Sequence, residues 1–165
     1  MSASVRTYAQ LVELLTRDQV SFQADPPNQS VHIPTRARGA DGVLVIRWQE
    51  AEGMAQLVHP LPITLTPRRL SAVEAAIARV NHALILPGFG INHEANLIYY
   101  RIALPVPNEG VPDHAIQGLF SAAVRTAADF GPSLRRVAEE DAPGDGILAD
   151  ASVDLAFSAS GLPMA

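Results

Sequence analysis

The feature that most constrains this fold is a change of hydrophobic period at Thr66-Pro67. Before it, residues 54–65 carry apolar side chains at every second position, which is typical of a strand with one buried face. After it, apolar residues recur at helical spacing, at Leu70, Val73, Ile77, Val80 and Leu84. Thr is a favoured N-cap and Pro suits the first helical position, so we expect a helix to begin at Thr66-Pro67. A strand that leads directly into a helix predicts a domain of mixed α and β elements.

The strand at residues 54–65 has a partner in the sequence just before it. Residues 43–48 form an apolar run rich in β-branched side chains, and residues 50–53 supply a hairpin turn. Pro60 and Pro62 share one parity, so one side of the second strand lacks two N–H donors near its end. We therefore expect this end of the strand at an edge of the sheet.

The other periodic segments place further elements on both sides of this hairpin. They predict a first helix at residues 4–17, short strands at 20–22 and 31–34, and a loop at 35–42. A second hairpin is expected at residues 89–104 and a last helix from residue 112 onward. Gly131-Pro132 is expected to kink or break the last helix, because proline removes a helical hydrogen bond. The predicted fold class is α+β, with the order α-β-β-β-α-β-β-α and an antiparallel sheet that has helices packed on one face.

Composition limits the chemistry that this chain can perform. With 165 residues, it has the size of one domain. It contains no Cys, and all 12 of its Lys and Arg residues are Arg. Thiolate nucleophiles, Cys-ligated metals, Schiff-base lysines and phosphate-loop lysines are therefore excluded. The net charge of −5 argues against non-specific nucleic-acid binding, which needs a basic surface, so direct contact with nucleic acid is not expected.

The location expected from the sequence is the cytoplasm. No apolar run approaches the length of a membrane-spanning helix, so no membrane partner is expected. The first ten residues lack the continuous apolar stretch of a signal peptide.

The short motifs that could indicate catalysis are incomplete. His93-Glu94 is not followed by a second His at the spacing of a zinc protease. Gly88-Phe89-Gly90 lacks the third glycine of a dinucleotide loop and precedes a strand. His59 lies on the apolar face of its strand, where a hydrogen-bonded core histidine is the favoured interpretation. We expect no enzyme activity, no cofactor and no metal site.

Four segments of the second half of the chain carry a resemblance to a known family. They are Val80-Asn81-His82-Ala83-Leu84, Gly88-Phe89-Gly90-Ile91, Tyr99-Tyr100-Arg101 and Asp129-Phe130-Gly131-Pro132-Ser133-Leu134. Through them, residues 70–137 resemble the YbjN family, bacterial proteins related in fold to the type III secretion chaperones that bind effectors. Trp48 only loosely echoes the family's tryptophan-rich N-terminal portion. The resemblance implies a type III secretion chaperone-like fold and a homodimer without cofactor that holds a partner polypeptide.

The composition changes near residue 140, which suggests two regions. Residues 1–140 form the expected YbjN-like domain, and residues 141–165 form an acidic tail rich in Gly, Pro and Ala. In the tail, Val153, Leu155 and Phe157 alternate as in a strand, so they are expected to dock on a strand edge or on the client groove if they dock at all.

The expected homodimer interface combines a stripe of small residues with one strand face. The small residues would let two copies of the second helix approach closely, and Arg79 could reach an acidic group across a two-fold axis. The predicted interface residues are Ala72, Ala76, Arg79, Ala83, Leu97, Tyr99 and Arg101.

An unidentified client protein is expected to bind across the first helix and the first hairpin. The strand at residues 43–48 is apolar on both faces, and a sheet with helices on one side leaves its other face uncovered. The predicted contacts are Leu11, Leu15, Val45 and Trp48, with Trp48 as the main anchor. Two alternatives remain open at this point: the tail covers the same surface, or the chain is a regulatory domain that binds a small ligand in an apolar pocket.

Overall fold

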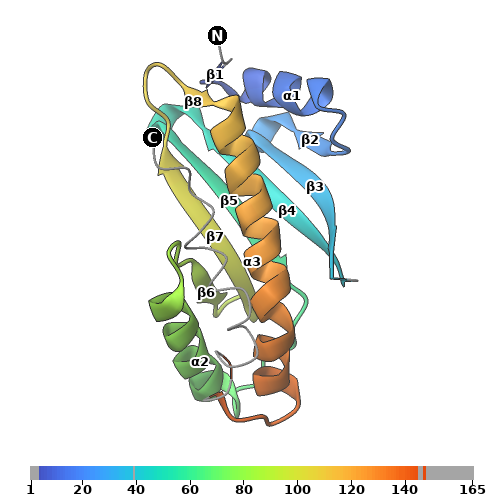
Figure 1. Ribbon diagram of the computed structural model, residues 1–165, viewed down its shortest axis with the longest axis vertical. Coiled ribbons are helices and arrows are strands. Elements are labelled where there is room, and N and C mark those ends of the chain that lie inside the picture. The colour runs from blue at the N-terminus through green and yellow to red at the C-terminus, as the bar shows by residue number, and fades with distance from the viewer. Residues whose placement is uncertain (1–3, 39, 145–146, 148–165) are drawn as a thin grey trace. The chain divides into compact units, whose positions relative to one another are not determined.

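The computed structural model describes residues 4–38, 40–144 and 147, and Figure 1 shows its elements. In chain order they are β1 (Ser4–Val5), α1 (Tyr8–Arg17), β2 (Gln23–Asp25), β3 (Ser30–Ala37), β4 (Ala40–Gln49), β5 (Met54–Leu61), α2 (Leu70–Ala83), β6 (Phe89–Asn92), β7 (Leu97–Pro105), β8 (Val111–Pro112) and α3 (Asp113–Glu139). Short 3-10 turns at Pro26–Asn28 and Glu50–Glu52 join β2 to β3 and β4 to β5. The chain divides into unit 1, Met1–Pro60 with Tyr100–Thr126, and unit 2, Leu61–Tyr99 with Ala127–Ala165.

Unit 1 is built on an antiparallel sheet in which β4 is central. Its strands follow the order β2-β3-β4-β5-β7, and β1 pairs separately with β8. The register places Val31 opposite Ile46 and Ile46 opposite Leu57, so these three buried side chains form one row across the sheet. Because side chains alternate along a strand, this row belongs to one face and its neighbours belong to the other.

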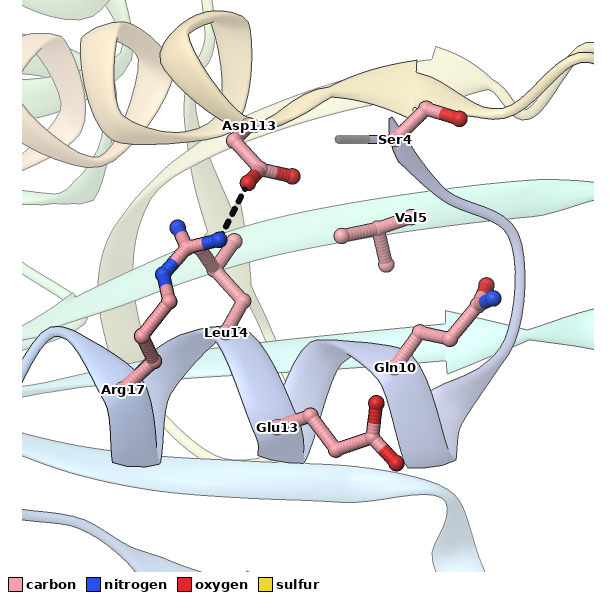
Figure 2. Close-up of a pocket in the computed structure, with 7 residues that line it drawn as sticks. All are labelled: Ser4, Val5, Gln10, Glu13, Leu14, Arg17 and Asp113. Atoms are coloured by element: carbon pink, nitrogen blue, oxygen red, sulfur yellow. Dashed lines mark hydrogen bonds and ion pairs between the residues drawn. The ribbon is translucent and has the colours of Figure 1, made fainter. Parts of the chain in front are cut away.

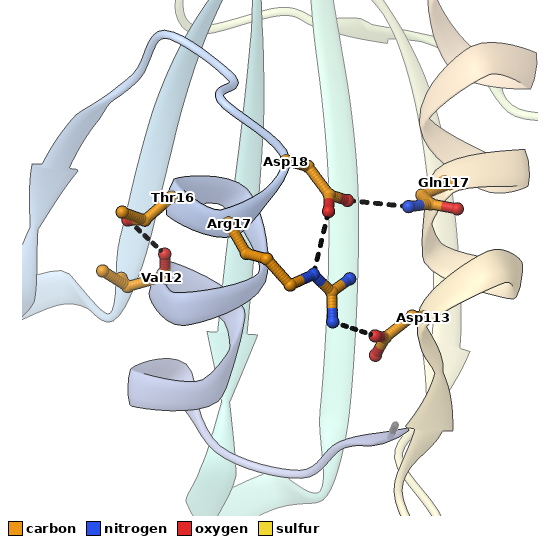
Figure 3. A network of polar contacts seen from close by, with 6 residues as sticks. All are labelled: Val12, Thr16, Arg17, Asp18, Asp113 and Gln117. Carbon is orange, nitrogen blue, oxygen red and sulfur yellow. Dashed lines mark hydrogen bonds and ion pairs between the residues drawn. The ribbon is translucent and has the colours of Figure 1, made fainter. Parts of the chain in front are cut away.

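The helices of unit 1 cover the face that carries this buried row. α1 begins at Thr7, which forms a capping box with Gln10, and it buries Leu11, Leu14 and Leu15. The α1 helix and the start of α3 lie side by side in front of the strands (Figure 3). Trp48 is 1% exposed beneath them, and its indole Nε1 donates to the carbonyl of Arg6 at 2.8 Å.

Unit 2 contains α2, β6, the first residues of β7 and the end of α3. Val73, Ala76 and Val80 of α2 are fully buried. The rings of Phe89 and Phe130 meet edge to face with centroids 5.9 Å apart, a favourable aromatic geometry.

The predicted α+β class, the antiparallel sheet and the helices on one face agree with the structure. The element order is richer than expected, because β1 and β8 form a second small sheet. The predicted loop at residues 35–42 is wrong, since β3 and β4 pair there as far as Ala37 and Ala40. The helix expected at Thr66-Pro67 begins at Leu70, because residues 66–69 form a turn in which Arg69 N–H donates to the Thr66 carbonyl.

Proline does not break the last helix. α3 runs through Pro132, although a kink or break was expected at Gly131-Pro132. Proline lacks one backbone donor and crowds the preceding turn, but the helix continues past it to Glu139. No helix in the described part of the chain is long and apolar enough to cross a membrane.

Candidate partner-binding surface

The sheet of unit 1 has a second face that the helices of unit 1 leave uncovered, and we call it the open face. β5 shows the difference between the two faces, because buried and half-buried residues alternate along its whole length. On the open face, His32 is opposite Val45 and Val45 is opposite Val58, which gives one row across three strands. All three of these side chains are half-buried.

A second apolar row lies next to the first on the open face. Pro34 of β3 is opposite Val43 of β4, two residues along each strand from the His32–Val45 pair. Val43 is 42% exposed and is one of the few large apolar side chains in the described chain with this exposure. Together the two rows make an apolar area that solvent reaches in the single chain.

The open face carries charged groups of both signs. Arg47 of β4 and Arg101 of β7 are exposed on it. Each lies two residues after a half-buried side chain on the same strand face, Val45 and Tyr99 respectively. Arg36 of β3 is also exposed and lies 3.6 Å from the carboxylate of Asp41. Two acidic residues occur in β2, β3, β4, β5 and β7: Asp41, and Asp25 of β2, which is opposite Ser30 in the row of Arg47.

Only one of the four predicted partner contacts lies on the open face. Val45 lies on the open face, half-exposed to solvent. Leu11 and Leu15 are 0% and 5% exposed, and Trp48 is 1% exposed, so these three belong to the core of unit 1. On the same helix, Tyr8 and Val12 are half-buried, so the apolar residues of α1 outside the core are these two and not Leu11 or Leu15. Sequence alternation had placed Val45 and Trp48 on opposite faces, but both faces are apolar, so it could not tell which one the helices cover.

A small pocket lies beside α1, on the helix-covered side of unit 1 (Figure 2). It has a volume of about 280 Å³ and is bounded by β1, α1 and the first residue of α3. Most of its lining residues are polar by type, but more than half of the lining surface is apolar. The residues are Ser4, Val5, Gln10, Glu13, Leu14, Arg17 and Asp113. The guanidinium of Arg17 closes one end, because its Nη1 donates to Asp113 Oδ2 at 2.8 Å.

The Arg17 side chain belongs to a polar network that joins α1 to α3 (Figure 3). Its Nε donates to Asp18 Oδ1 at 3.0 Å, and Gln117 donates to Asp18 Oδ2 at 2.7 Å. The hydrogen bonds from Arg17 and Gln117 lower the pKa of Asp18, and those to Asp18 and Asp113 raise the pKa of Arg17. These groups therefore satisfy one another, and the network fixes the end of α1 against the start of α3.

His59 is a core histidine, as its place on an apolar strand face suggested. It is 7% exposed, and its Nδ1 lies 3.1 Å from the carbonyl oxygen of Pro60. A carbonyl only accepts, so Nδ1 carries the proton and Nε2 accepts from the Thr35 hydroxyl at 3.0 Å. Burial lowers the pKa of His59 below its usual value, although the hydrogen bond to Pro60 opposes this shift. The ring is neutral and structural.

In unit 2, the residues after α3 cover the small-residue stripe of α2. A Cβ atom placed on Gly144 would lie 3.4 Å from Ala76 Cβ and 3.6 Å from the Ala72 carbonyl oxygen, so Gly144 packs on this stripe. Ala76 is 0% exposed. Ala76 is therefore not open to a second copy, whereas Ala72 is half-buried and Gly144 approaches it only at its backbone carbonyl. Ala83 is half-buried and Arg79 is exposed.

Arg69 holds this segment in place. Its Nε donates to the Val137 carbonyl at 2.8 Å, its Nη2 donates to the Ala142 carbonyl at 3.0 Å, and its Nη1 pairs with Asp141. A cation at the C-terminal end of a helix also interacts favourably with the helix dipole. Arg69 therefore joins the start of α2 to the end of α3.

The predicted interface residues of β7 share one face of that strand, opposite to the face of the buried Ile98 and Tyr100. Leu97 and Tyr99 are half-buried, and Arg101 is exposed. The Tyr99 ring lies directly over Gly90, where a Cβ atom would be 2.7 Å from the Tyr99 hydroxyl. A larger residue at position 90 would therefore displace the end of the Tyr99 side chain. The predicted tail docking of Val153, Leu155 and Phe157 lies outside the described residues.

Comparison with known proteins relates the chain to one family and one fold. The YbjN family, described as "Putative bacterial sensory transduction regulator", matches residues 7–136. The crystal structure of YbjN from E. coli has a TM-score of 0.59 and 12% identity, and the match covers 81% of this chain and 93% of that chain. A chain of the HopA1-SchA chaperone–effector complex has a TM-score of 0.52 and 11% identity, and the match covers 78% of this chain and 94% of that chain. No curated protein matches the sequence.

Proposed function

The chain belongs to the YbjN family, and from this membership and its open face we propose that it is a non-enzymatic module that holds a partner polypeptide. The observation that carries the proposal is the apolar area of Val43, Val45 and Val58 on a sheet face without a helix. Apolar side chains gathered on an exposed face are typical of protein-binding surfaces. The fold shared with a chain of a chaperone–effector complex supports the same function.

The client surface is therefore revised relative to the sequence prediction. We keep Val45 as a contact and add Val43 and Val58, which lie beside it across the strands. Leu11, Leu15 and Trp48 support this surface from the core, because their side chains lie under the helices. Client capture on the open face leaves that packing intact.

A small-ligand regulatory domain is the second candidate, and the pocket beside α1 is the observation that favours it. This pocket is small, at about 280 Å³, whereas ligand pockets in proteins have volumes of roughly 300–1,000 Å³. Its Arg17 and Asp113 already bind each other. The open face therefore supports a protein partner better than the pocket supports a small ligand.

We also propose that the protein acts as a homodimer in the cytoplasm. Ala76 is fully buried, so the predicted interface residues that remain accessible are Ala72, Arg79 and Ala83 of α2 and Leu97, Tyr99 and Arg101 of β7. The chain lacks Cys, which is compatible with a reducing compartment.

A single substitution on the open face tests the client proposal. Val45→Glu places a charge in the apolar area, and we expect capture of the client from the native cell to fall about tenfold or more. Ser121→Glu is the matched control, because Ser121 is exposed on α3 and gains the same charge. The measurement is quantitative mass spectrometry of proteins retained by the tagged full chain. Equal retention of every protein by the parent and both variants would show that the open face does not hold the client.

A further inference from the structure

The apolar rows of the open face contain a histidine, His32 of β3. Its side chain is opposite Val45 of β4 on one side and opposite Gln23 of β2 on the other, and Val58 of β5 follows Val45 in the same row. The other histidine in the strands of unit 1, His59, is on the helix-covered face. The His32 side chain is half-buried, so a partner that covers the two valines also covers the imidazole.

The hydrogen bonds between β3 and β4 bring the His32 side chain close to Val45. Just before β3 the Trp48 N–H donates to the Gln29 carbonyl at 2.8 Å, in the register that the two strands continue. Facing residues of an antiparallel pair alternate between hydrogen-bonded and non-hydrogen-bonded positions, so His32 and Val45 form a non-hydrogen-bonded pair. Pro34, two residues along, fits this alternation because it has no N–H to donate to β4. In such a pair the Cβ atoms lie about 5 Å apart, which places the imidazole beside the valine.

The surroundings of His32 do not compensate a positive charge on its ring. None of the described residues hydrogen-bonds or forms an ion pair with the ring, so solvent is the partner of its nitrogens. The neighbouring row on one side holds one charged group of each sign, Asp25 of β2 and Arg47 of β4, and the row on the other side holds Pro34 and Val43. A protonated imidazole beneath a bound partner would therefore lose its water without gaining a counter-ion from this chain.

We infer that His32 makes capture of the client depend on pH, and this inference rests on the proposed function. A client that covers Val45 and Val58 admits the neutral imidazole and excludes the protonated one, because an unpaired buried charge is strongly disfavoured. Histidine side chains change their charge between about pH 5 and 8, so the binding-competent form becomes rarer as the pH falls. The apparent affinity falls in proportion to the neutral fraction. Capture is therefore strong at neutral pH and weak in acid.

A peptide without titratable groups tests the inference. It has leucines on one face and serines on the other, both of its ends are blocked, and it carries a dye whose emission does not change with pH. The peptide is titrated against the full-length protein by fluorescence anisotropy at about pH 8 and at about pH 5.5, on either side of the range in which histidine titrates. We expect the parent to bind it about fivefold or more weakly at the lower pH.

Three variants assign the response to His32. His32→Gln should bind the peptide equally at both pH values, because an amide stays neutral, and His32→Arg should bind it weakly at both. His114→Gln is the matched control, because His114 is exposed on α3 of unit 1 and the same side chain is removed there. It should keep the response of the parent. All three variants retain the buried His59, so a loss of stability in acid through His59 affects them equally.

The outcomes separate the role of His32 from the role of the open face. The inference is overturned if the parent binds the peptide equally at both pH values, or if His32→Gln keeps the response of the parent. If that equal binding is abolished by Val45→Glu, only the role of His32 fails and the proposed function stands. Binding that Val45→Glu leaves unchanged, or no binding to the parent at either pH, would overturn the open face as the client surface and the inference with it.

Discussion

At the scale of single residues, the close approach of Gly42 to His59 explains how a histidine is accommodated in the core of unit 1. A Cβ atom at position 42 would lie 2.8 Å from His59 Cε1 and 3.0 Å from Thr35 Oγ1. A larger residue at position 42 would therefore push the ring away from the Thr35 hydroxyl. The sequence showed that His59 lies on an apolar strand face. It could not show that Gly42 and Thr35 face it, because that depends on the pairing of β3 with β4 and on the packing of β5.

The lowered pKa of His59 predicts a specific loss of stability in acid. The unfolded chain binds a proton at His59 more readily than the folded chain, because burial disfavours the charged ring. The stability associated with the neutral ring is thus present above the unfolded pKa of about 6.5 and is lost as the pH falls through the folded pKa. His59→Phe should flatten the dependence of the unfolding free energy on pH below about 6.5, as measured by urea unfolding. An equally steep dependence in the variant would show that other groups cause the acid sensitivity.

At the scale of elements, helix α2 shows how a correct pattern can lead to a wrong surface. Its small residues do form one stripe, as the spacing of Ala72 and Ala76 indicated. The stripe is occupied by Gly144, a residue 68 positions after Ala76 in the same chain. Such a long-range contact leaves no trace in the local hydrophobic period, so an intramolecular contact and a dimer contact look the same in the sequence.

Two neighbouring alanines separate these two interpretations of α2. Ala76 is fully buried, whereas Ala75 is exposed, so Ala76→Glu buries a charge and Ala75→Glu does not. We expect Ala76→Glu to lower the unfolding free energy by about 2 kcal/mol or more, and Ala75→Glu to change it by less than about 0.5 kcal/mol. Urea unfolding measures the stability, and light scattering on the same samples measures the mass. If Ala76→Glu is as stable as the parent but halves the mass, the stripe is a dimer contact instead.

At the scale of the whole molecule, the sequence predicted more of the fold than of the site. The alternation along β4 and β5 and the helical stripe of α2 are local patterns, and they identified the α+β class correctly. The site depended on which face of β4 the helices cover, and Val45 and Trp48 are both apolar residues of that strand. Contacts far apart in the sequence determine this face: the Trp48 indole donates to the Arg6 carbonyl just before α1, and the Arg17 and Asp18 network joins α1 to α3. The basic residues of the open face were visible in the sequence, but only the strand order brings Arg47 and Arg101 onto one sheet.

The central claim is that a partner polypeptide lies on the open face, and site-specific photo-crosslinking tests it most directly. A photoreactive amino acid is placed in the full chain at Val45, at Ser121 on the exposed side of α3, or at Glu13 beside the α1 pocket. After irradiation in the native cell, we predict a covalent adduct with another protein from position 45 and none from positions 121 and 13. An adduct from position 13 or 121 without one from position 45 would contradict the claim and would place the partner on the helix-covered side of unit 1.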